Sequence, residues 1–135
     1  MQIKVDWLQK DFLMEAENEE GGKIRIDGKT RTEGLSPMQL LIAGIGGCSA
    51  IDVISILEKQ KQKLTDLSVE VDADKQQLKE GYSEFKTIHL HFKLSGELDV
   101  KKVERALELS ITKYCSVSKA LEKGSEISYD YEIIT

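Results

Sequence analysis

The chain has 135 residues, of which 40% are hydrophobic and 32% charged, and its formal net charge is −5. This length and balance predict one globular domain over residues 1–135 with its own core. An acidic chain without a basic run lacks the electrostatic footprint of a nucleic-acid-binding protein. The N-terminus has no signal-peptide pattern, and the longest apolar stretch, residues 40–51, is too short to span a bilayer. We therefore expect a cytoplasmic protein without a membrane partner.

The first third of the sequence predicts three short strands joined by turns. Apolar and polar residues alternate over residues 3–7 and 12–16, which is the period of a strand with one buried face. A charged turn over residues 17–22 separates them from a third strand at residues 24–26. The dipeptide Asp27-Gly28 then marks another turn.

A long helix is expected from Ser36 to about residue 60. Ser36 suits the N-cap, Pro37 suits the first helical position, and Gln39 completes the spacing of a capping box. The first two-thirds of this helix is apolar almost all round, so we expect it to be buried on every side. One sheet cannot cover all of that surface, which predicts burial against a second copy of the chain in a homodimer.

The second half of the chain predicts two longer strands, two helices and a last strand. Strict alternation marks the strands, and an apolar stripe at helical spacing marks the first of these helices. These elements are expected at residues 67–73, 88–94, 99–111, 117–122 and 127–133. The order βββ–α–ββ–αα–β, with one apolar face on each strand, predicts an α+β fold in which an antiparallel sheet packs on the long helix.

The two cysteines, Cys48 and Cys115, are separated by 67 positions. In a reducing compartment they should not form a permanent structural disulfide. Their spacing also excludes a local CxxC motif or a zinc knuckle. They are either two packed core thiols or a pair with redox chemistry.

Cys48 is expected midway along the long helix, directly after Gly47, where small residues leave room for a small ligand. Glycines inside a helix cost roughly 1 kcal/mol each against Ala, which a sequence tolerates where another group must come close. Asp52 follows at i+4 on the same face, and a carboxylate raises the pKa of a neighbouring thiol. A reactive Cys48 therefore needs a cation from elsewhere in the chain. The candidates are Lys10, Arg25 and Arg31.

Cys115 is expected where the second helix ends and the third begins. Amide groups at a helix start favour a thiolate, and a break in the helix leaves the residue room to reach a partner. Both features suit a resolving cysteine, which attacks an oxidised partner thiol.

Other chemistries have little support in the sequence. His89 and His91 share one strand face, which we expect to be exposed, and no third metal ligand is obvious. No phosphate loop, GxSxG motif or paired-carboxylate motif is present. We therefore expect neither a metal nor a cofactor.

Two segments resemble the cysteine motifs of the OsmC/Ohr superfamily. The segment GLSPMQLLIAGIGGCSAIDVISIL, residues 34–57, is similar to the central cysteine helix of that family. The segment YCSVSKAL, residues 114–121, is similar to its second motif. The order of strands and helices matches as well, so the resemblance covers essentially the whole chain. It implies an OsmC-like fold and an intertwined homodimer with two active sites at the subunit interface.

The resemblance also implies an activity, which is thiol-dependent reduction of organic hydroperoxides in oxidative-stress defence. Cys48 matches the peroxidatic cysteine, which becomes a sulfenic acid. Cys115 matches the resolving cysteine, which condenses with that sulfenic acid to form a disulfide. A dithiol of the lipoyl type, or another thiol, is then the implied reductant.

The sequence departs from the peroxidase pattern of the family at a charged pair. Met38 stands where peroxidase members carry Glu, and the best matches for their thiolate-stabilising Arg are Lys10 and Arg31. A lysine presents a point charge and not a planar fork, so it copies that arginine poorly. Met38 and Gly47 are expected to line the pocket. The alternative function is a non-catalytic dimer that binds a small hydrophobic ligand or senses redox state.

Overall fold

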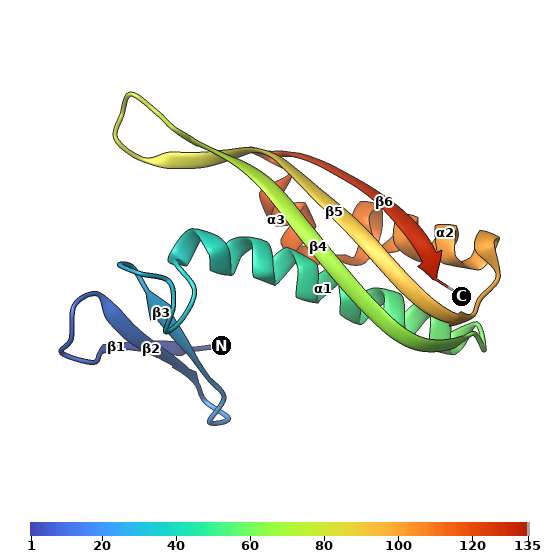
Figure 1. The fold of residues 1–135 in the computed structure, drawn as a ribbon, viewed down its shortest axis with the longest axis horizontal. Coiled ribbons are helices and arrows are strands. Elements are labelled where there is room, and N and C mark those ends of the chain that lie inside the picture. The colour runs from blue at the N-terminus through green and yellow to red at the C-terminus, as the bar shows by residue number, and fades with distance from the viewer. Residues whose placement is uncertain (135) are drawn as a thin grey trace. The chain divides into compact units, whose positions relative to one another are not determined.

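The structure is a computed structural model that describes residues 1–134 (Figure 1). It follows the predicted order of elements, with one π-helical turn, η1, inserted after the second helix. The elements are β1 (Ile3–Trp7), β2 (Leu13–Asn18), β3 (Lys23–Asp27), α1 (Pro37–Lys59), β4 (Lys63–Gln77), β5 (Ser83–Glu97), α2 (Val100–Leu109), η1 (Ser110–Tyr114), α3 (Ser116–Leu121) and β6 (Glu126–Ile134).

The chain divides into two compact units, Met1–Leu41 and the part from Ile42 onward. In the first unit β1, β2 and β3 form a three-stranded antiparallel sheet in that order. The loop after β3 is held by the buried Asp27, whose carboxylate accepts hydrogen bonds from the backbone N–H groups of Lys29, Thr30 and Glu33. These bonds, led by that of Lys29, hold the pKa of Asp27 well below its usual range. The expectation of one domain over residues 1–135 stays a prediction.

The start of α1 confirms the predicted capping box. The backbone N–H of Gln39 donates to Ser36 Oγ at 3.1 Å, and the backbone N–H of Ser36 donates to Gln39 Oε1 at 2.9 Å. Each side chain thereby satisfies an amide group that the helix itself leaves unpaired.

In the second unit, β4, β5 and β6 form one three-stranded sheet with helices on one face (Figure 1). β4 and β5 pair antiparallel over most of their 15-residue lengths. β6 pairs with β5 parallel, so the expectation of an antiparallel sheet was wrong for this strand. The physical reason lies in the connection, because α2, η1 and α3 form a helical crossover that returns the chain in the direction of β5.

The core of this unit lies between the sheet and the helices. The buried side chains of β5 alternate with half-buried ones on the outer face of the sheet, which agrees with the predicted alternation. They lie in the same core as buried residues of α1, α2 and η1. They include Ile88, Leu90, Phe92, Leu94, Val53, Leu57, Val103, Leu107 and Ile111. A Cβ built on Gly46 would lie 3.0 Å from Val71 Cγ2, so this glycine permits the close approach of α1 to β4.

The long helix α1 is less buried in the single chain than its composition predicts. Its fully buried side chains follow one stripe, whereas Leu41, Ile51 and Ile54 are 45%, 68% and 46% exposed. The expectation of burial on every side is therefore wrong for one copy of the chain. By length and composition α1 could cross a membrane, but core helices of soluble proteins satisfy the same criterion.

Candidate functional site

Cys115 lies at the junction between η1 and α3. Its backbone is extended, with φ −72° and ψ 104°, and its side chain caps α3 by accepting a hydrogen bond from the backbone N–H of Ser118 at 3.3 Å. The predicted helix break is therefore present. Its cause is η1, a widened helical turn of a kind that often marks functional sites.

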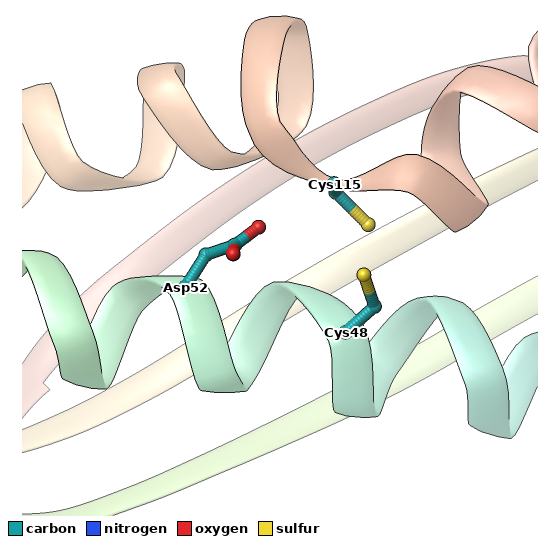
Figure 2. Close-up of side chains that lie close together, drawn as sticks. All are labelled: Cys48, Asp52 and Cys115. Atoms are coloured by element: carbon teal, nitrogen blue, oxygen red, sulfur yellow. The ribbon is translucent and has the colours of Figure 1, made fainter.

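Cys48 projects from α1 toward Cys115, and Asp52 lies one turn further along the same helix (Figure 2). The sulfur atoms of the two cysteines and a carboxylate oxygen of Asp52 all lie within 4.8 Å of one another. Both cysteines are free thiols; Cys48 is half-buried and Cys115 is fully buried. Two residues 67 positions apart in the sequence thus form one dithiol site beside a carboxylate.

A chain of buried and partly buried hydrogen bonds links η1 to α1 at this site. Ser110 Oγ lies 2.9 Å from Ser49 Oγ and donates to Asp52 Oδ2 at 3.1 Å. A hydroxyl has one proton to donate, so Ser49 must be the donor to Ser110. No sequence pattern pointed to Ser110, because only tertiary packing brings it to α1.

The pKa of the Cys115 thiol is raised to about 11. Burial is the largest cause; the hydrogen bond from Ser118 lowers the pKa, whereas the neighbouring Cys48 and the Asp52 carboxylate raise it further. The helix start was expected to favour the thiolate of Cys115, and this expectation was wrong, because the pKa of the thiol is raised and not lowered. The amide contact exists, but desolvation outweighs it, and Cys115 is a protonated thiol near neutral pH.

A cavity of about 560 Å³ opens beside the carboxylate, within the second unit. Its lining combines polar and apolar side chains from α1 and from the region around η1. The lining residues are Asp52, Ser55, Ile56, Lys59, Gln60, Leu109 and Tyr114. This cavity gives solvent and small molecules a route to Asp52.

The other predicted site residues lie mostly in the first unit. Lys10 is exposed and pairs with Glu33 at 3.4 Å, and Arg31 is exposed with a positive φ of 60°. Met38 is half-buried near the start of α1. Gly47 is exposed, and a Cβ built there would contact nothing within 4 Å. The roles predicted for these four residues remain predictions.

His89 and His91 lie on the outer face of the β4–β5–β6 sheet, as the sequence predicted. Asp130 on β6 accepts from both imidazoles, at 2.9 Å from His89 Nε2 and 2.7 Å from His91 Nδ1. The bond to Asp130, followed by that to Glu132, raises the pKa of His91. These acidic partners were missed because they depend on the parallel pairing of β6.

Comparison with known proteins establishes the family. The OsmC-like protein family matches residues 27–130. The protein YhfA of Escherichia coli K12 is 38% identical over 135 residues, covering 99% of this chain and 98% of its own. The chain therefore belongs to the OsmC-like protein family.

Solved structures agree on the fold. An OsmC-like protein from Mycoplasma pneumoniae superimposes with a TM-score of 0.83 at 16% identity, covering 99% of this chain and 96% of its own. The organic hydroperoxide resistance protein OhrB of Bacillus subtilis gives a TM-score of 0.69 at 15% identity, covering 97% and 96%. The expected OsmC-like α+β fold is confirmed.

Replacing Asp52 with Asn should lower the pKa of Cys115, because it removes a negative charge that disfavours the thiolate. The measurement is the pH dependence of the rate of alkylation by iodoacetamide in Cys48→Ala, in which Cys115 is the one remaining thiol, with and without Asp52→Asn. Asp72→Asn, the same charge change at an exposed position on β4, serves as the control. Identical pH dependences of the alkylation rate for all three proteins would contradict the electrostatic role of Asp52.

Proposed function

We propose that this protein is a two-cysteine peroxidase that reduces organic hydroperoxides. The observation that supports this function most is the approach of the Cys48 and Cys115 sulfurs to within 4.8 Å. Structural relatives named as organic hydroperoxide resistance proteins support the same chemistry. We also propose that the protein works in the cytoplasm, where thiols are kept reduced.

The first step belongs to Cys48, which is the more accessible thiol of the pair. Its thiolate attacks the outer oxygen of the hydroperoxide and the O–O bond breaks. The departing alkoxide takes up a proton and leaves as an alcohol, while Cys48 becomes a sulfenic acid. An apolar α1 beside Cys48 favours organic hydroperoxides over hydrogen peroxide.

The second step joins the two sulfurs. Cys115 loses its proton, attacks the sulfenic sulfur of Cys48 and forms a disulfide, while the hydroxyl group leaves as water. We assign Asp52 as the acceptor of that proton, since its carboxylate lies within 4.8 Å of both sulfurs. A dithiol of the lipoyl type, or another thiol, then reduces the disulfide by thiol–disulfide exchange.

The protonated resting state of Cys115 agrees with its role in the second step and not in the first. A buried thiol with a pKa near 11 is a poor nucleophile toward peroxide, so it remains reduced until Cys48 is oxidised. Proximity then compensates for its low thiolate fraction, because the reaction occurs within one chain.

The test is intact-mass spectrometry of the reduced protein after brief treatment with one equivalent of cumene hydroperoxide. We expect a loss of about two mass units within seconds, which reports one intramolecular disulfide. Cys48→Ser should show no change, and Cys115→Ser should stop at a sulfenic acid that dimedone traps. No change in the wild type within minutes would refute the peroxidase and favour the non-catalytic ligand-binding alternative.

We further propose that the protein forms a homodimer through α1. The exposed apolar side chains of Ile51 and Ile54 support this, because a second copy would remove them from water. The site of one chain would then be closed in part by the other, as the family resemblance implies.

Light scattering after size-exclusion chromatography should give twice the 15.2 kDa mass of the chain. Ile51→Glu should shift the protein toward the monomer, because it buries a charge in the proposed interface. Val100→Glu, at a 50% exposed apolar position of α2, is the control and should leave the dimer intact. A wild type that elutes as a monomer at micromolar concentration would contradict the homodimer.

A further inference from the structure

We propose that the reduced protein binds one Zn²⁺ ion through the thiolates of Cys48 and Cys115 and the carboxylate of Asp52. Cysteine sulfur and carboxylate oxygen are both established zinc ligands, and three protein ligands leave a fourth position for water. Binding requires only the reduced cysteines, so this proposal does not depend on peroxidase activity. It changes the expectation from the sequence, which considered only the two histidines as metal ligands.

The distances between the three donor atoms suit a tetrahedral ion. With Zn–S near 2.3 Å and Zn–O near 2.1 Å, neighbouring donors lie about 3.5–3.8 Å apart. The donors of Cys48, Asp52 and Cys115 already lie within 4.8 Å of one another, so they need to approach by about 1 Å to reach this geometry. Cys48 and Asp52 also share the i, i+4 helical spacing that places two zinc ligands side by side in HExxH motifs.

Two of the three ligands already have the hydrogen bonds that support metal ligands. Ser110 Oγ donates to Asp52 Oδ2 at 3.1 Å, which orients the carboxylate. The backbone N–H of Ser118 donates to Cys115 Sγ at 3.3 Å, which orients the sulfur and stabilises its negative charge. Such outer contacts fix ligand geometry and strengthen metal binding.

The charge at the site favours a divalent cation. Within residues 1–134 no ion pair involves Asp52. Two thiolates and one carboxylate carry three negative charges, which Zn²⁺ reduces to one. Sulfur donors select zinc over magnesium or calcium, which prefer oxygen ligands. The cavity beside Asp52 and Tyr114 gives the ion an entry path.

The half-buried pair His89 and His91, on the outer face of the sheet, is the competing location for a metal. There Asp130 already lies between the two imidazoles, and an ion would have to displace its hydrogen bonds to both. The histidine side chains are 42% and 27% exposed, so an ion bound there would keep water among its ligands. This pair therefore serves as the control site in the experiment.

The test is competitive titration of the reduced full-length protein with Zn²⁺ against a chromophoric chelator, repeated with Co²⁺ to detect thiolate-to-metal charge-transfer absorption. We expect one ion per chain and a thiolate band. Cys48→Ser and Cys115→Ser should each abolish the band. Ser110→Ala should weaken Zn²⁺ binding by roughly 10- to 100-fold, and Asp52→Asn by more than that. His91→Gln should have no effect.

Three results would overturn the zinc site. The first is that the reduced wild type does not bind Zn²⁺, and the second is that Asp52→Asn binds it unchanged. The third is that His91→Gln loses Zn²⁺ binding while the cysteine variants keep it. Asp52→Asn keeps the size of the side chain, and thermal unfolding confirms that each variant is folded. The zinc titration uses no peroxide, so its outcome is separate from that of the peroxidase test. A protein that binds Zn²⁺ but does not reduce peroxide would refute only the proposed function. A protein that reduces peroxide but does not bind Zn²⁺ would refute only the zinc site.

Discussion

The site depends on the buried contact between α1 and η1. Ser49, Ser110 and Asp52 are linked by hydrogen bonds of 2.9 and 3.1 Å, and the two serines are fully buried. Buried hydroxyl groups without partners cost free energy, so these bonds favour a single register of η1 on α1. That register is what brings Cys115 to Cys48. Loss of the contact would leave both cysteines in place along the chain but would separate their sulfurs.

The same contact gives the site its electrostatic character. The donor from Ser110 holds a carboxylate beside two thiols, and the resulting negative potential works against a thiolate at Cys115. Cys115 in such a site stays a protonated thiol until a cation stabilises its thiolate or until Cys48 is oxidised and offers a sulfur to attack. The proposed peroxidase and the proposed zinc site correspond to these two cases. One oxidises Cys48 first, and the other brings a cation to the reduced pair.

Much of the local structure follows from local sequence patterns. The capping box of Ser36 and Gln39, the alternation along β5 and the shared face of Cys48 and Asp52 all depend on neighbours in the sequence. Period and capping rules describe such short-range relations, so they predict them well. The two cysteine motifs together were specific enough to indicate the family, which the comparisons confirm.

The remaining features depend on contacts between distant segments. The π-helical turn η1, the parallel pairing of β6 and the acidic partners of the two histidines have no short-range signature. The pKa of Cys115 depends on burial, which the sequence does not report, and burial there outweighs the helix-start effect. The exposed side of α1 likewise reflects how much surface one sheet can cover.

The central claim is that Cys48 and Cys115 of one chain form a single redox pair. Its most direct test is mild oxidation of the protein with diamide, followed by tryptic mapping without reduction. We predict a protein of single-chain mass under denaturing conditions, in which the peptide of residues 32–59 is linked to that of residues 114–119. Links between two copies of residues 32–59, or two thiols that stay free, would contradict a redox pair within one chain.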